Sequence, residues 1–300
     1  MAYIIENANL LKSKGVSKTS ILIKDEKIAA IRPQFKKYTY MKMNADPFIM
    51  TPPHVILDSQ IPLEKPFHDM KEYYIDHFIK NGCTTFITYV SVDKEYLLES
   101  SRKEILKKLV NSPIDYIIGM KTPLRLLTPA MIRKSKKGKF PVIFVEISEA
   151  EEIEQIPWGW IKEAMFPYNS PLSPIFMNRS NRELERAKMA WNKMVKKERV
   201  PAIEDEITEG SAISLSILKK IGIYPIKSFL EQGGEVSYNL YSNGREIRKI
   251  EEFDLFHYYK HRLTCTIHKG TIIRAGEEVL FRPGFGEHVL IKTPLFFSAD

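Results

Sequence analysis

Cysteine is scarce in this 300-residue chain, which contains only Cys83 and Cys265. The two residues are far apart and no CxxC pair exists, so the pattern argues against a zinc ribbon or a dithiol redox centre. Both cysteines lie in stretches with strand-like composition. We therefore expect two buried free thiols in a reducing cytosol, where disulfides are rare.

Long apolar runs are also missing. The longest, such as residues 140–145, are far shorter than the roughly 20 residues that a membrane-spanning helix needs. Residues 1–7 do not combine a basic start with an apolar stretch, so they do not resemble a secretory signal. The sequence also lacks a phosphate-binding glycine loop and a GxSxG nucleophile motif. We expect a cytoplasmic protein that has no membrane partner.

Positive charge exceeds negative charge, with a formal net charge of +8, but it is spread along the chain. The densest basic runs, 133–139 and 193–199, lie at the ends of predicted helices, where cations complement the helix dipole. No aromatic residues are interleaved with them, so nucleic-acid binding is not the expected function. An anion or nucleic-acid binder that uses Lys134–Lys139 remains an alternative.

The first fifty residues have the composition of β-strands. Strands are predicted at 3–11, at two positions within 19–31, and at 48–50, with an exposed connection over 32–46. A segment of this size cannot bury a core of its own, so it must pack on another part of the chain.

From Val55 the pattern alternates between strand and helix. Strands are predicted at 55–57, 83–90, 116–120 and 140–147, and helices at 67–80, 94–110, 129–137, 182–197 and 213–220. A short acidic helix starts at 148, residues 158–166 read as a strand or a broken helix, and the three prolines of 167–174 predict irregular structure. Residues 200–210 read as a loop. Strands return at 235–241, 263–268, 271–273, 278–281 and 288–291.

Repeated strand–helix units predict a parallel sheet with helices outside it. The expected fold class is therefore α/β, with a truncated or incomplete TIM-like (β/α) barrel over residues 51–229. Residues 1–50 and 230–300 are expected to form a small composite β-sandwich domain from both termini.

Several short motifs occur in the order found in one enzyme family. They are Ile5–Leu10 (IENANL), Ile21–Ile31 (ILIKDEKIAAI), Pro53–Asp58 (PHVILD), Gly82–Thr85 (GCTT) and Leu218–Gly233. Together they resemble the amidohydrolase superfamily, the metal-dependent hydrolases related to dihydroorotase. The resemblance implies a barrel with an attached β-domain and hydrolysis of carbon–nitrogen bonds.

The metal ligands that this resemblance implies are not all present. The family's two metal-binding histidines after the first barrel strand correspond to Gln60 and Pro62. A proline side chain has no ligand atom, and a glutamine amide is a poor ligand for a transition metal. Glu146 could take the position of the ligand on the fourth strand, and Asp205 that of the final aspartate. The histidines that the family carries after its fifth and sixth strands have no match, because none occurs between His77 and His257.

The barrel portion is also short. About 170 residues separate Pro53 from Ile223, whereas a complete (β/α)₈ barrel needs roughly 200 or more. The resemblance therefore implies a degenerate and truncated member of the family.

Two other groups of residues carry possible chemistry. His257 and His261 are four apart and could bind zinc from one helix face, or they are surface histidines in a strand-rich tail. Asp58 and His68 could form a metal-independent acid–base pair. Alternatively, Asp58 hydrogen-bonds its own turn and His68 lies at the start of a helix.

The leading prediction is an amidohydrolase-like protein without the family's metal site, which serves as a non-catalytic binding or structural module and is oligomeric. No cofactor is expected in that case, and the sequence identifies no small-molecule ligand. The alternative is a hydrolase of non-peptide carbon–nitrogen bonds whose altered site uses Asp58, Glu146 and His68. Zinc or another divalent metal is expected only under this alternative.

Overall fold

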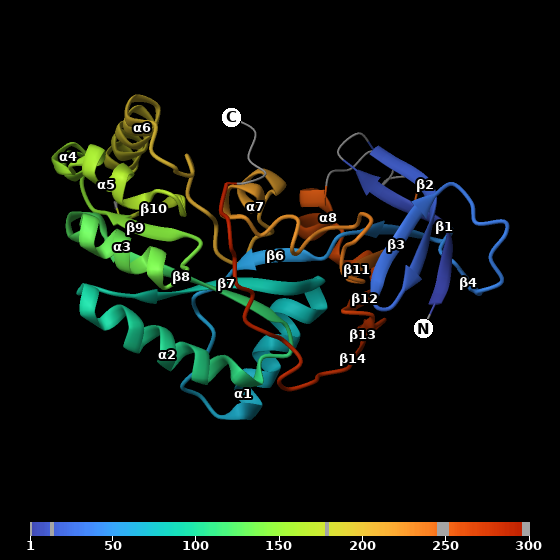
Figure 1. Ribbon diagram of the computed structural model, residues 1–300. Coiled ribbons are helices and arrows are strands. Elements are labelled where there is room, and N and C mark those ends of the chain that lie inside the picture. The colour runs from blue at the N-terminus through green and yellow to red at the C-terminus, as the bar shows by residue number, and fades with distance from the viewer. Residues whose placement is uncertain (1, 13–14, 178–179, 245–251, 296–300) are drawn as a thin grey trace.

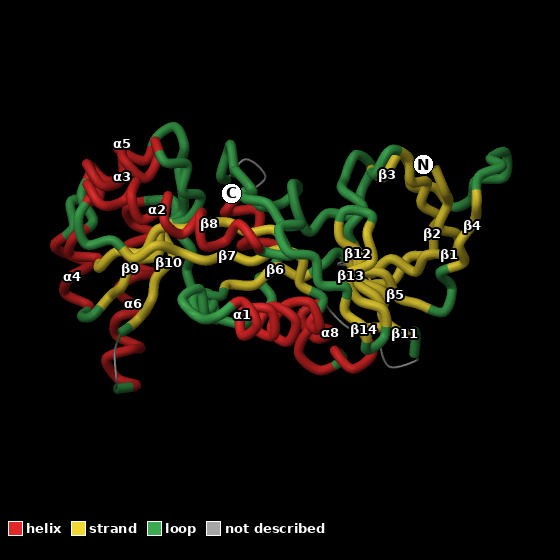
Figure 2. The backbone as a smooth tube through the Cα atoms, turned by 90° about the horizontal axis from the view of Figure 1, so that it is seen from below, coloured by secondary structure: helices red, strands yellow, loops and turns green. Residues whose placement is uncertain are grey.

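The computed structural model describes residues 2–12, 15–177, 180–244 and 252–295. Its strands form two separate sheets (Figure 1). A five-stranded parallel sheet has the order β10-β9-β8-β7-β6, and a nine-stranded sheet has the order β14-β13-β12-β11-β5-β1-β2-β3, with β4 paired to β1. Figure 2 shows the two groups of strands next to each other along the molecule.

The parallel sheet, which we call the half-barrel, contains the four predicted barrel strands and a fifth, β10, that was not predicted. Its strands are β6 (His54–Leu57), β7 (Cys83–Ser91), β8 (Asp115–Pro123), β9 (Ile143–Ile147) and β10 (Leu172–Phe176). The helices of this part are α1 (Phe67–Tyr73), α2 (Leu98–Lys108), α3 (Pro129–Lys137), α4 (Ala150–Gln155), α5 (Trp158–Met165), α6 (Asn181–Glu198) and α7 (Leu215–Ile221).

Local sequence signals define several of these helices. Thr128 is the N-cap of α3 and accepts a hydrogen bond from the Met131 N–H at 3.1 Å, and Pro129 occupies the first helical position. Gly222 ends α7 with a φ of 86°, a left-handed conformation that glycine adopts without a steric penalty. The predicted helix at 67–80 continues from α1 through a π turn (Tyr74–Phe78) and a 3₁₀ turn (Ile79–Asn81).

The second sheet is composite, as predicted. Its strands are β1 (Ala2–Lys12), β2 (Gly15–Lys24), β3 (Lys27–Arg32), β4 (Met41–Asn44), β5 (Phe48–Thr51), β11 (Tyr238–Ser242), β12 (Leu263–His268), β13 (Thr271–Ala275) and β14 (Glu278–Val279). β5 pairs antiparallel with β11, with Ile49 opposite Tyr241, so the two ends of the chain are joined directly. Strand pairing connects all nine strands into one continuous sheet, whereas the predicted β-sandwich would consist of two separate sheets.

Residues 158–166, predicted as a strand or a broken helix, contain the helix α5. Three local predictions differ from the structure. Residues 167–174 are not wholly irregular, since β10 begins at Leu172 and includes Pro174. β10 is an edge strand of the half-barrel, where a missing backbone donor is tolerated. The exposed connection 32–46 contains β4, and the region of His257 forms the helix α8 (Glu252–Tyr258) rather than a strand.

The outer face of the half-barrel packs against its helices. This core includes Ile56, Phe86, Ile118 and Val145 from the strands, and Trp191 of α6 is fully buried in it. Together these residues form the larger of the two layers of apolar side chains on the half-barrel.

The inner face of the half-barrel is covered by the chain itself. Leu57, Ile117 and Phe144 pack there against residues from 203–223 and from 289–291. The C-terminal segment, red in Figure 1, returns from β14 across the parallel strands towards α7. Its Val289 N–H donates to Tyr116 O at 2.9 Å, so this segment lies along β8. It adds only an isolated bridge at Tyr116–His288, where a strand over 288–291 was predicted.

None of the helices in the described ranges is both long and apolar enough to cross a membrane.

Candidate functional site

Polar side chains gather where the parallel strands end. Lys121 lies near the end of β8 and Glu146 near the end of β9, and their side chains form an ion pair at 2.9 Å. Both belong to the inner face, because Lys121 is four residues from Ile117 and Glu146 is two residues from Phe144. The pair is partly shielded, with about one fifth of each side chain exposed (20% and 23%). The Lys121 Nζ also lies 5.1 Å from the ring centre of Tyr89 on β7. Barrel folds keep their chemistry at this end of the strands.

Asp58 lies just beyond the end of β6, but on the opposite face. It is two residues from Ile56, whose side chain packs in the helical layer, and it is 4% exposed. Its carboxylate accepts hydrogen bonds from the Gln60 N–H at 2.8 Å and from the Tyr73 hydroxyl at 2.9 and 3.1 Å. Asp58 therefore hydrogen-bonds its own turn, the simpler of the two interpretations of the sequence.

Electrostatics makes this carboxyl group less acidic than usual. Burial raises the pKa of Asp58, while the bonds from Gln60 and Tyr73 counteract part of that rise. Burial and the adjacent Asp58 carboxylate also raise the pKa of the Tyr73 phenol. Tyr73 stacks on His77, with ring centres 4.0 Å apart. The Tyr73 hydroxyl therefore donates to a carboxyl group that is largely shielded from water.

A second carboxylate binds the chain next to Asp58. Glu209 accepts hydrogen bonds from the Ser59 N–H at 2.9 Å and from the Ser59 hydroxyl at 2.6 Å. This contact holds the loop before α7 to the end of β6.

The three residues predicted to act together do not meet in the described contacts. Asp58 faces the helical layer and Glu146 faces the inner layer. The His68 side chain, on α1, is 77% exposed and lies 3.1 Å from Glu72, one helical turn away. No hydrogen bond or ion pair between described residues joins any two of Asp58, Glu146 and His68.

Sequence reasoning missed Tyr73, Lys121 and Glu209. Lys121 had a detectable signal, since it follows the predicted strand 116–120 at its carboxyl end. Tyr73 lies within the predicted helix 67–80, and Glu209 lies in the segment 200–210 that was predicted as a loop. Their contacts depend on how distant segments pack.

The histidine pair His257 and His261 and the basic run 133–139 were the other candidate sites, and several of their side chains contact neighbouring residues. His257 lies on α8 and its Nε2 is 3.0 Å from the Ser211 hydroxyl, while His261 lies in a separate 3₁₀ turn (Lys260–Arg262). In the basic run, Lys136 donates to the Ala164 carbonyl at 2.9 Å and so holds the end of α5. Lys134 is 3.4 Å from Glu95.

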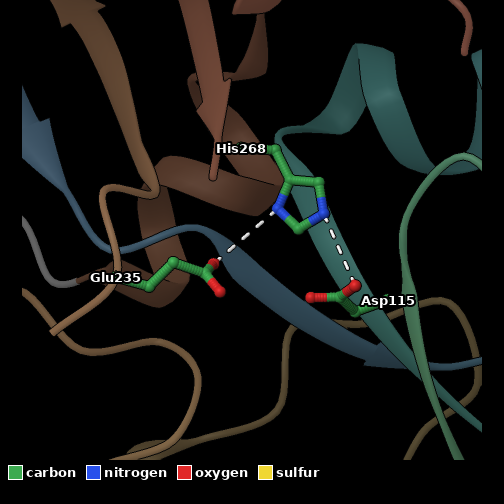
Figure 3. A group of neighbouring side chains, drawn as sticks. All are labelled: Asp115, Glu235 and His268. Carbon is green, nitrogen blue, oxygen red and sulfur yellow. Dashed lines mark ion pairs between the residues drawn. The ribbon is translucent and has the colours of Figure 1, made fainter. Parts of the chain in front are cut away.

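One group of potential metal ligands occurs among the described residues, and it lies elsewhere. Asp115, Glu235 and His268 offer ligand atoms within 4.8 Å of one another. Asp115 starts β8, Glu235 precedes β11 and His268 ends β12, so the group lies between the half-barrel and the nine-stranded sheet. Figure 3 shows the imidazole between the two carboxylates. Such donors are of the kind that binds divalent metals.

Two ammonium groups already neutralise these carboxylates. Lys227 Nζ lies 2.6 Å from Asp115 Oδ2 and 2.5 Å from Glu235 Oε2, and Lys269 Nζ lies 2.7 Å from Asp115 Oδ1. Burial by itself would raise the pKa of Asp115, but His268 and Lys227 outweigh it and lower that pKa. Burial would likewise lower the pKa of Lys227, but the two carboxylates outweigh it and raise that pKa. Lys227 therefore stays charged and lies where a metal ion would have to enter.

The metal centre implied by the family resemblance does not fit the residues at the carboxyl ends of the strands. A catalytic zinc site needs about three protein ligands around an open position. Within the described ranges, the three-ligand group lies at the opposite end of β8 and already contains ammonium groups. Gln60, exposed, and Pro62 follow β6 and supply no such ligands.

The comparisons with known proteins concern the fold. No family model and no curated protein sequence matches the chain. Among solved structures, a D-hydantoinase (dihydropyrimidinase) from Thermus sp. aligns with a TM-score of 0.61 at 11% identity, covering 98% of this chain and 100% of that one. The dihydropyrimidinase from Brevibacillus agri NCHU1002 aligns with a TM-score of 0.57 at 11% identity, over 98% and 99% of the two chains. A prolidase complexed with N-methylphosphonate-L-proline aligns with a TM-score of 0.55 at 7% identity, over 92% and 100%.

These structures belong to amidohydrolase superfamily hydrolases, and the chain has their fold. The resemblance derived from the sequence motifs is confirmed at the level of the fold.

Proposed function

We propose that this chain is a non-catalytic binding or structural module built on the hydantoinase-like fold, with an incomplete barrel of five parallel strands. The observation that carries the proposal is that the chain's own segments close the inner face of the half-barrel. In a complete barrel enzyme the other strands fill this interior, and the site lies in the loops at the carboxyl ends of the strands. Here residues from 203–223 and from 289–291 take the place of those strands.

Backbone hydrogen bonds hold the covering segments in place. The Gly210 N–H donates to Leu57 O at 2.9 Å and the Ile213 N–H donates to Val55 O at 2.8 Å, so residues 210–213 run along β6. Ile203 N–H donates to Leu172 O at 2.8 Å at the other edge of the sheet. Apolar side chains from these segments fill the space between the two edges.

The polar residues at the strand ends support the same proposal. Lys121 occupies the inner face beside Glu146 and neutralises its carboxylate. Glu146 is the residue that, by the family resemblance, could take the position of the fourth-strand ligand. A carboxylate paired with an ammonium group is a poor ligand for a metal cation. Under this proposal, residues 51–229 form the barrel-like domain, residues 1–50 and 230–300 form the composite β-domain, and the protein assembles as a homo-oligomer.

Metal analysis and hydrolase assays test the proposal together. The purified protein is analysed for metals by mass spectrometry and incubated with a hydantoin, a dihydropyrimidine and a prolidase substrate, with and without added Zn²⁺. We expect no stoichiometric metal and no turnover above a Glu146→Gln control. A stoichiometric metal whose removal abolishes turnover would overturn the proposal. Light scattering after size-exclusion chromatography tests the oligomer.

One observation favours a second candidate, a hydrolase with an altered site. The buried Asp58 has a raised pKa and a phenol hydrogen bond, and such a carboxyl group can act as a general acid. This candidate predicts turnover that Asp58→Asn abolishes and Glu72→Gln, on the exposed surface of α1, leaves unchanged. Equal loss or equal retention in the two variants would reject it.

A further inference from the structure

A pocket on the outer side of the half-barrel is separate from all the groups described so far. It has a volume of about 260 Å³ and lies between the segment that follows β8 and the helix α4 that follows β9. Both segments leave the carboxyl ends of their strands, the region where open α/β sheets bind ligands. The volume is slightly below the roughly 300–1,000 Å³ of sites for drug-sized ligands, so the pocket suits a smaller molecule.

One wall of the pocket presents hydrogen-bond donors. Arg125 is exposed, and no described hydrogen bond or ion pair uses its guanidinium group. Thr128 accepts the Met131 N–H with a lone pair, which leaves its hydroxyl proton available for donation. The wall also contains the positive end of the nine-residue helix α3. A guanidinium group binds a carboxylate through two parallel hydrogen bonds, so this wall suits a carboxylate.

The facing wall presents acceptors. Glu152 and Gln155 are three residues apart on α4, so they lie on the same face of that helix. Glu152 Oε2 accepts the Ser148 N–H at 3.2 Å, while its second oxygen has no hydrogen bond among those described. A carboxylate with a free oxygen beside an amide suits an ammonium or another N–H donor.

The remaining lining is apolar. Leu127 is 2% exposed and is fixed by its N–H bond to Leu124 O at 2.9 Å. Ile156 is half-buried, and Pro129 and Pro157 complete the lining. Burying a small aliphatic group against these side chains would remove apolar surface from water, which favours binding.

From these features we propose that the pocket binds a small zwitterion with an aliphatic body, of the free amino-acid type. Its carboxylate would contact Arg125 and Thr128, and its ammonium group would contact Glu152 and Gln155. The inference does not depend on whether the inner face of the half-barrel is catalytic, because the pocket lies in the helical layer.

Three probes of matched shape separate the two polar ends. L-Leucine carries both charges, 4-methylpentanoate lacks the ammonium group and 3-methylbutylamine lacks the carboxylate. Binding to the full chain is measured by ligand-detected NMR and titration calorimetry. We expect L-leucine to bind at millimolar concentration or below, and each single-charge probe to bind about ten-fold more weakly, as expected for loss of a charged hydrogen bond.

Two single substitutions test which residue contacts each charged end of the ligand. Arg125→Gln should weaken L-leucine about ten-fold and leave 3-methylbutylamine unchanged, while Glu152→Gln should weaken L-leucine and leave 4-methylpentanoate unchanged. Arg133→Gln, on the same helix as Thr128 but outside the pocket, is the matched control. Thermal unfolding of each variant shows that it is folded.

The proposal fails if L-leucine does not bind the wild-type protein at millimolar concentration. It also fails if Arg125→Gln and Arg133→Gln have equal effects on L-leucine. Unchanged L-leucine binding in Arg125→Gln, whether or not the variant is destabilised, also overturns the proposal.

Discussion

Replacement of Lys227 by methionine should destabilise the protein strongly. The Lys227 side chain is 8% exposed and Asp115 is fully buried, so their ion pair is shielded from water. Lys227→Met retains an unbranched side chain of similar length while removing the positive charge. Asp115 and Glu235 are then left close together without the ammonium group that lies between them.

The remaining contacts determine the size of the effect. Removing one partner of a buried ion pair typically costs about 3–5 kcal/mol, because the other charge stays buried. Asp115 retains Lys269 at 2.7 Å and the Glu287 N–H at 2.9 Å. We therefore expect a loss near the lower end, about 3 kcal/mol of the free energy of unfolding.

Urea denaturation at pH 7, followed by circular dichroism, measures the loss. Lys103→Met is the matched control, because Lys103 is 70% exposed and lies 3.6 Å from Glu99, so about 0.5 kcal/mol or less is expected. The reasoning is refuted if Lys227→Met lies within about 1 kcal/mol of the wild type.

The pH dependence of this loss has a definite sign. The pKa of Asp115 is lowered in the folded protein, so its ion pairs contribute stability above its unfolded pKa of about 3.9. That contribution disappears as the pH falls through the lower folded-state pKa. The difference between wild type and Lys227→Met should therefore be largest near neutral pH and should shrink under acidic conditions. A difference that grows as the pH falls below 4 would contradict this assignment.

Three further predictions concern other parts of the molecule. Burial, with a smaller contribution from a neighbouring histidine, lowers the pKa of His54 to about 3. As the pH decreases from 6.5 to 3, the unfolded state therefore binds a proton that the folded state does not, and the free energy of unfolding decreases. In His54→Gln the urea-denaturation midpoint should depend less on pH across this window, and an unchanged pH dependence would contradict the assignment. A Cβ at Gly286 would lie 1.9 Å from Ile114 O, so Gly286→Ala should cost about 3 kcal/mol in the same assay, and a neutral result would show that the segment does not lie on β8 as described. Tyr73→Phe removes hydrogen bonds that lower the pKa of Asp58, so that pKa should rise further in a carbon-13 NMR titration; an unchanged or lower pKa would exclude the hydroxyl contact.

The sequence by itself determined most of the secondary structure and the pairing of the two chain ends. Thr128 and Pro129 start α3, and Gly222 ends α7, because capping is a local interaction between neighbouring residues. The β-branched strands of the first fifty residues could not bury a core alone, which required a distant partner, and β11 is that partner. The lack of metal ligands at Gln60 and Pro62 was also evident from residue identity alone.

Local signals failed where the surroundings compensate for a poor local sequence. Pro174 suggested irregular structure, yet it lies in β10, because an edge strand tolerates the missing N–H donor. Residues 158–166 were compatible with either a strand or a helix. They form the helix α5, whose apolar side packs against α3 and against the core residue Trp191.

The arrangement of the candidate sites was decided by the tertiary structure alone. Asp58 and Glu146 both follow parallel strands, yet they face opposite layers, because successive side chains of a strand alternate between its two faces. The network of Asp115, Lys227 and His268 joins segments more than one hundred positions apart. No local pattern encodes such a network, because it forms only when β12 and the segment after α7 pack beside the start of β8.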